Sequence, residues 1–171
     1  GFKEYYQRHG QVVFENPSPG NKEGGITTLE EKSCGCIRKG GTSPVSGVMS
    51  YGGRVNGKKG LLLLQAPGND LVASTAEAAA GAQMVLFTTG RGTPYGGPVP
   101  TLKISTNTAL ARKKSNWIDF DAGQLLTTAD AGRVEEDFFR FVLDVASGRK
   151  LARTEQNGYR EIAIFKDGVT L

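Results

Sequence analysis

The stretch Gly60–Gly97, GLLLLQAPGNDLVASTAEAAAGAQMVLFTTGRGTPYGG, decides the fold. Its Leu61–Gln65 segment opens with an unbroken apolar run, which is typical of a strand buried on both faces. Leu71–Ala80 predicts a helix because it is rich in alanine and is followed by Gly81, a residue that commonly ends helices. Met84–Phe87 is a second apolar run. Strand, helix and strand joined by short turns predict a βαβ unit with parallel strands and a right-handed crossover.

Ligands of parallel sheets bind beyond the carboxyl ends of the strands, which here are Ala66–Asp70 and Thr88–Gly97. The second loop has more glycine and polar residues than a connection needs. Its Arg91 offers a planar fork for a carboxylate or phosphate. The glycine spacing matches neither a dinucleotide fingerprint nor a phosphate-binding loop. The alternative is that both loops only turn the chain, with Asn69 or Asp70 capping the helix.

The third expected strand, Val99–Ile104, is followed by a second turn that leads from a strand into a capped helix. Thr106 or Asn107 can cap a helix over Thr108–Lys113. Because the carboxyl ends of parallel strands meet at one edge, the polar residues after all three strands are expected to lie side by side. The candidate substrate-binding residues at this edge are Asn69, Asp70, Thr89, Arg91, Thr93, Thr106 and Asn107.

The remaining segments predict a single domain of parallel α/β type over residues 1–171. Expected helices are Phe2–His9, one that begins at Thr27 or Thr28 and ends near Gly40, a short one within Pro44–Tyr51, and Val134–Val145. Expected strands are Gln11–Glu15, Trp117–Phe120 and Glu161–Phe165. Asn16–Gly25, with two prolines and three glycines, is expected to hold no regular element, and Asn56-Gly57 is expected to turn.

Composition bounds the partners. The net charge of +4 mildly favours an anionic small molecule, and no basic stripe with interleaved aromatic residues favours nucleic acid. No signal peptide or apolar stretch of transmembrane length is present, so no membrane partner is expected. Cys34 and Cys36 are too close for a structural disulfide, which predicts reduced thiols and a cytoplasmic protein. The abrupt start at Gly1 suggests a piece of a longer protein.

Two further segments hold candidate catalytic or metal-binding groups. The loop from Glu15 to Gly25 concentrates carboxylates, amides and a lysine, so Glu15 or Glu23 is a candidate general base and Lys22 a candidate for steadying an enolate. The alternative is a solvated turn. Thiolates bind iron or zinc, but a Cys-Gly-Cys pair in a chain with one histidine cannot alone close a four-ligand site. The alternative is a pair of buried helix cysteines.

Several long motifs resemble one enzyme family across essentially the whole chain. They are ENPSPGNKEGGITTLEEKS (15–33), GCIRKGG (35–41), APGND (66–70), LFTTGRGTPYGG (86–97), KISTNT (103–108), WIDFDAG (117–123) and EIAIFKDGVTL (161–171). Together they look like the C-terminal part of the altronate/galactarate dehydratase family. The tail NGYREIAIFKDGVTL looks more like the altronate branch.

The resemblance implies a Rossmann-like parallel α/β fold, as part of a larger catalytic domain whose N-terminal remainder is the principal partner. It implies a homo-oligomeric hydro-lyase that converts a sugar acid into a 2-keto-3-deoxy acid and uses Fe2+ or Mn2+ as a cofactor. D-altronate is the leading candidate substrate. Cys36 is then the better metal candidate of the two cysteines. Arg91 or Lys22 is expected to hold the carboxylate, and Glu15, Glu23 or Asp70 to act as base or metal contact.

The same resemblance leaves other activities open. A galactarate dehydratase or a sulfo-lyase of the same family would share this domain. A sensing module that binds a sugar acid without catalysis is an alternative of another class. The isolated chain is expected to be inactive, because the family's preceding cysteine motifs are absent from it.

Overall fold

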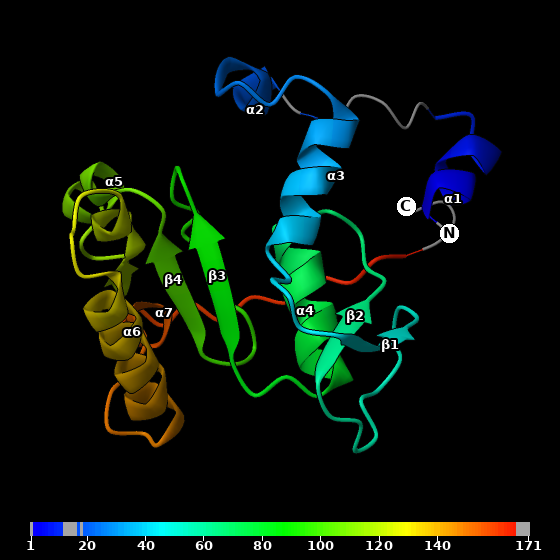
Figure 1. The fold of residues 1–171 in the computed structure, drawn as a ribbon. Coiled ribbons are helices and arrows are strands. Elements are labelled where there is room, and N and C mark those ends of the chain that lie inside the picture. Colours follow the sequence, from blue (N-terminus) through cyan, green and yellow to red (C-terminus); the bar gives the residue numbers. More distant parts are fainter. Residues whose placement is uncertain (1, 12–16, 18, 167–171) are drawn as a thin grey trace. The chain divides into compact units, whose positions relative to one another are not determined.

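The computed structural model describes residues 2–11, 17 and 19–166 (Figure 1). The chain forms two compact units, each described here by itself. The first comprises Gly1–Val48 and Gly57–Leu63, and the second comprises Met49–Asn56 and Leu64–Leu171. In the described residues no helix has the length and apolar character needed to cross a membrane.

The described residues of the first unit form three helices and most of a two-stranded sheet. Its elements are α1 (Phe2–Arg8), α2 (Pro19–Glu23), α3 (Leu29–Arg38), β1 (Val45–Met49) and β2 (Leu61–Leu64). The predicted helices at α1 and α3 are confirmed. Of the two possible capping boxes, the structure uses Thr28, whose hydroxyl accepts from Glu31 N while the Glu31 carboxylate accepts from Thr28 N.

Two predictions for this unit were wrong. Asn16–Gly25 was expected to be irregular, but Pro19 begins α2 because its fixed φ suits the first position of a helix. Pro44–Tyr51 was expected to be helical, but it holds β1, whose valines favour a strand and whose backbone pairs with β2. The predicted strand Gln11–Glu15 falls on residues 12–16, outside the described part of the chain.

The second unit is built on a parallel sheet in the order β3-β4-β5. Its elements are α4 (Asp70–Ala80), β3 (Val85–Thr89), β4 (Thr101–Ser105), α5 (Thr108–Lys113), β5 (Phe120–Asp121), the 3-10 helix η1 (Ala122–Leu126), α6 (Ala131–Ala146) and α7 (Arg153–Gln156). Figure 1 shows β3 and β4 side by side and pointing the same way. In their register Phe87 is paired with Lys103. The predicted parallel α/β fold class is confirmed.

The strand pairing differs from the prediction in one respect. Leu61–Gln65 and Met84–Phe87 were expected to be the parallel strands of one βαβ unit, but the structure places β2 in a sheet with β1, and β3 in a separate sheet with β4. The described sheet therefore has two parallel connections: the glycine-rich segment joins β3 to β4, and the segment with α5 joins β4 to β5. The glycine-rich segment returns to the start of β4, where Pro100 O accepts from Val85 N. The loop therefore also connects two adjacent parallel strands, which was not predicted from its sequence.

The core lies on one face of β4. Leu102 is fully buried with Val145 of α6 and Ala152, and Met84, Phe141 and Val142 pack against them. Because side chains alternate along a strand, Lys103 points to the opposite face. The predicted helix Val134–Val145 is confirmed within α6.

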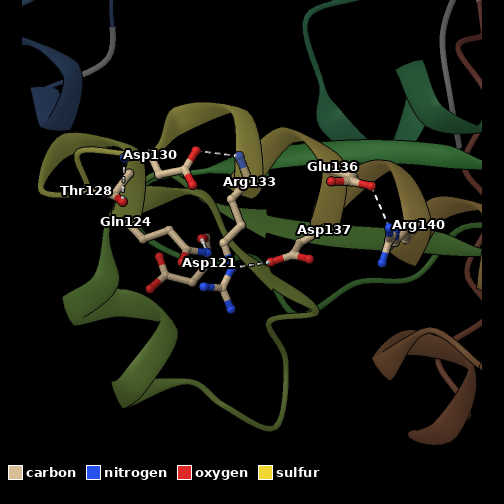
Figure 2. Close-up of polar contacts among 8 residues, drawn as sticks. All are labelled: Asp121, Gln124, Thr128, Asp130, Arg133, Glu136, Asp137 and Arg140. Carbon is tan, nitrogen blue, oxygen red and sulfur yellow. Dashed lines mark hydrogen bonds and ion pairs between the residues drawn. The ribbon is translucent and has the colours of Figure 1, made fainter.

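Polar contacts fix the start of α6 and line its exposed side (Figure 2). Asp130 caps the helix by accepting from Arg133 N at 3.0 Å, and Thr128 Oγ1 accepts from Asp130 N at 3.1 Å. Arg133 pairs with Asp137, and Glu136 pairs with Arg140. All four ion-pairing side chains are more than half exposed, so these pairs contribute little to stability.

The chain end differs from the sequence-based expectation. Only Phe120–Asp121 of the fourth strand region forms a strand, and Glu161–Phe165 is extended without belonging to a sheet. The backbone of this tail donates instead to three other acceptors: Glu161 N to Gly96 O, Ala163 N to Thr75 Oγ1, and Phe165 N to the Tyr51 hydroxyl. An alternating pattern cannot distinguish these acceptors from a strand ladder.

Candidate functional site

Two loops interlock at the carboxyl ends of β3 and β4. Thr106 N donates to Thr89 O at 3.0 Å, and Asn107 Nδ2 donates to Gly90 O at 3.1 Å. Within the first loop, Gly92 N donates to Thr89 Oγ1 at 2.9 Å. The carboxyl-end loops of β3 and β4 therefore form one bonded cluster, as expected for Thr89, Thr106 and Asn107. For Asn69 and Asp70 the premise was wrong, because the strand before them, β2, is bonded to β1 and belongs to a different sheet.

Asn107 joins this cluster to α5. Its Oδ1 accepts from Leu110 N at 2.8 Å and caps the helix, while its Nδ2 holds Gly90. From the other side, Gly123 approaches so closely that a Cβ there would overlap with backbone atoms of Asn107 and Thr108. The position of Asn107 is thus determined by three elements.

We predict that Asn107→Ala lowers the free energy of unfolding by about 1–2 kcal/mol, since both the cap and the Gly90 contact are lost. Asn107→Asp keeps the capping oxygen and should cost less. Urea unfolding of the intact protein measures both. Asn69→Ala is the matched control. Asn69 Oδ1 caps α4 by accepting from Val72 N, so this variant measures the cost of losing a helix cap. An Asn107→Ala protein as stable as wild type would show that the cluster is not held this way.

The other predicted substrate-binding residues are distributed as follows. Arg91 and Thr106 are exposed, and Thr93 is half-buried in the same loop as Arg91. Asn69 caps α4, and the exposed Asp70 begins it. The Asp70 carboxylate is near enough to raise the pKa of both Tyr95 and Lys103. The exposed Arg91 guanidinium is the cation that this loop presents at the surface.

The candidate catalytic and metal residues belong to the first unit. Lys22 and Glu23 are exposed on α2, and Glu15 lies outside the described residues. Cys34 and Cys36 are free thiols exposed on α3, so the alternative of buried helix cysteines was wrong. Within the described ranges no three His, Cys, Asp or Glu residues gather where they could hold a metal ion. The described residues therefore do not form an iron or manganese site by themselves.

Three residues important for this region were not singled out from the sequence. Asp119 accepts from the backbone N–H groups of Lys103 and Arg153, both at 2.7 Å, and so ties β4 to α7. Burial raises the pKa of Asp119, although both hydrogen bonds favour its charged form. Lys103 and Tyr95 are buried on the face of the sheet that the β3–β4 loop crosses. A lysine within an apolar strand segment was the one sequence signal for this site.

Comparison with known proteins places this chain in a family. Residues 1–170 match the family described as "D-galactarate/Altronate dehydratase, C-terminal". The chain belongs to that family. It is 56% identical over 170 residues to the altronate dehydratase of Escherichia coli (strain K12) and 58% identical over 172 residues to that of Bacillus subtilis (strain 168). Each match covers 99% of this chain and 34% of the relative.

A third relative widens the range of substrates within the family. The galactarate dehydratase (L-threo-forming) of Escherichia coli (strain K12) is 42% identical over 155 residues, covering 88% of this chain and 29% of that protein. The chain therefore spans about a third of the length of the curated altronate dehydratases it matches. The predicted resemblance to this dehydratase family is confirmed.

Proposed function

We propose that this chain supplies the carboxylate-binding loops of a hydro-lyase that dehydrates a sugar acid to a 2-keto-3-deoxy acid. D-altronate is the leading candidate substrate. The observation that carries the proposal is the bonded cluster of Thr89, Thr106 and Asn107 beside Arg91, at the carboxyl ends of parallel strands. Ligands of parallel sheets bind at this edge. Family membership supports the same reaction class.

The reaction removes the proton alpha to the carboxylate and expels the β-hydroxyl as water. Negative charge then develops on the carboxylate oxygens, so a cation held beside them lowers the barrier. Arg91 can hold both oxygens through its planar fork. The loop cluster fixes the backbone on either side of Arg91, through Gly90 O and Gly92 N.

The other proposed roles rest on the sequence pattern alone. Glu15 or Glu23 would be the general base, Asp70 of the second unit is a third option, and Lys22 would stabilise the developing charge. We propose that this chain acts as part of a longer protein whose remainder completes the site and holds iron or manganese, since the chain spans about a third of the altronate dehydratases it matches. We further propose that the protein is cytoplasmic, since the two exposed free thiols on α3 suit a reducing compartment. We also propose that it forms a homo-oligomer.

A substrate panel on the intact protein tests this function. D-altronate, galactarate and sulfolactate would each be incubated with it, and the keto-acid product and released sulfite measured. Keto acid from D-altronate supports the proposal. Keto acid from galactarate alone would overturn the choice of substrate, and sulfite release from sulfolactate would replace dehydration by sulfo-lyase chemistry. Saturable binding of sugar acids without turnover would favour the non-catalytic binding module.

A further inference from the structure

Lys103 is the most deeply buried charged side chain among the described residues of the second unit. It is 1% exposed and lies in the middle of β4. Within the described part of the chain, its Nζ has no hydrogen-bond partner. Burying an unpaired ammonium group opposes folding, so a lysine here is not explained by core packing.

Two aromatic rings enclose this ammonium group. Nζ lies 3.6 Å from the centroid of the Tyr95 ring and 4.2 Å from that of Phe87. The two rings meet edge to face at 5.2 Å. A cation over a ring face is attracted by the ring quadrupole, and this attraction is strongest where water is excluded. Lys103 therefore attaches Tyr95 to the sheet without directional hydrogen bonds.

Tyr95 in turn belongs to the loop that carries Arg91. Its hydroxyl lies 2.8 Å from Ser74 Oγ of α4, which fixes the far end of the ring. Next to it, Gly97 N donates to Thr101 Oγ1 at 3.0 Å, and Gly96 O accepts from Glu161 N at 2.7 Å. The second half of the loop is thus held to the sheet, to α4 and to the tail.

The surroundings favour a positioning role over a catalytic one for Tyr95. Burial raises its phenol pKa, and the nearby carboxylates of Asp70 and Glu77 raise it further, outweighing the opposite effect of the Ser74 hydrogen bond. Lys103 lies over the ring face rather than beside the hydroxyl. A phenol in this setting is a poor acid at neutral pH.

We propose that Lys103 is a positioning residue, whose ammonium group holds the Tyr95 end of the Thr88–Gly97 loop so that Arg91 is presented in one orientation. The carboxylates that act on this ammonium are Asp70 at the start of α4, Asp119 before β5 and Glu161 of the tail. They raise the pKa of Lys103, but burial outweighs them and lowers it from 10.5 to about 8. With this pKa, the ammonium group is mostly charged at pH 7 and loses its proton around pH 8.

The inference rests on the proposed function for its catalytic consequence, but not for its structural one. In the intact protein, Lys103→Met keeps a long straight side chain and removes the charge. We expect amide exchange at Gly92 and Gly97 to accelerate by at least about tenfold, since local opening controls exchange. With D-altronate we expect kcat/KM to fall by about 10- to 100-fold, through misplacement of the binding group.

The pH profile distinguishes a charge effect from loss of packing. Wild-type kcat/KM and loop protection should both fall above about pH 8, whereas Lys103→Met should be low and flat throughout. Lys103→Arg, which stays charged, should restore loop protection and remove the fall. If circular dichroism shows that the arginine variant does not fold, the pH profiles of the wild-type and Lys103→Met proteins still distinguish a charge effect from a loss of packing. Lys150→Met, which removes an exposed lysine ion-paired with Asp144, is the matched control.

Each outcome has a distinct meaning. Unchanged exchange at Gly92 and Gly97 in Lys103→Met would overturn the inference whatever the activity. Faster exchange with unchanged kcat/KM would also overturn it, because loop order would then not determine turnover. Faster exchange in a protein that dehydrates no sugar acid would instead reject the proposed function and leave the structural half of the inference intact.

Discussion

Gly123→Ala is expected to lower the free energy of unfolding of the intact protein by about 3 kcal/mol. A Cβ at this position would overlap with backbone atoms of Asn107 and Thr108. Backbone at a helix start cannot rotate away as a flexible side chain can, so η1 and the Asn107 loop must separate. Because Asn107 also holds Gly90, the strain reaches the Arg91 loop. Activity should therefore fall together with stability.

The matched control is Gly132→Ala in the first turn of α6. A Cβ there meets only Asp130 Oδ1, at an ordinary 3.7 Å. Alanine favours helices over glycine by up to about 1 kcal/mol, so this variant should be as stable as wild type or slightly more so. Urea unfolding measures both proteins. Equal midpoints for the two variants would show that Gly123 is not packed as described.

The stability of the wild-type protein is expected to rise between about pH 8 and pH 10.5 because of Lys103. Burial lowers the pKa of its ammonium group from 10.5 to about 8 in the folded state. Between these values the unfolded chain binds one proton more than the folded chain, so raising the pH favours folding. The full difference is about 3 kcal/mol, and below pH 8 the penalty is constant.

Comparison with Lys103→Met isolates this contribution. Denaturation midpoints of both proteins would be measured from pH 7 to pH 10.5, and their difference removes the other titrating groups. The methionine variant should gain on wild type at pH 7 and lose that advantage at high pH. A pH-independent difference would mean that Lys103 titrates at its ordinary pKa. Such a variant would unite higher overall stability with a looser loop, as expected where a functional charge is buried at the expense of stability.

Local signals explain what the sequence predicted correctly. Thr28, Asn69 and Asn107 each cap a helix within three residues of their own position, so the cause and the effect lie in one short segment. The polar residues after β3 and β4 were also placed at one edge, because parallel pairing alone requires it. Those interactions need no knowledge of distant contacts.

Features that depend on distant residues were missed. The tail at Glu161–Phe165 alternates like a strand, yet its backbone donates to Gly96, Thr75 and Tyr51. Lys103 lies within the strand predicted at Val99–Ile104, and the ring of Tyr95, from the preceding loop, packs on its ammonium group. The choice of β1 as the partner of β2 is likewise a tertiary outcome. No local periodicity encodes these contacts.

The central claim is that the loop at the carboxyl end of β3 binds the substrate carboxylate through Arg91. The most direct test is steady-state turnover of D-altronate by the intact protein with Arg91→Ala, beside Arg112→Ala as an exposed arginine of α5 that stands outside the proposed machinery. We predict that kcat/KM falls by roughly 100-fold or more for Arg91→Ala, since a bidentate charged contact is lost, and stays at the wild-type value for Arg112→Ala. Undiminished kcat/KM at low substrate in the Arg91→Ala protein would contradict the account.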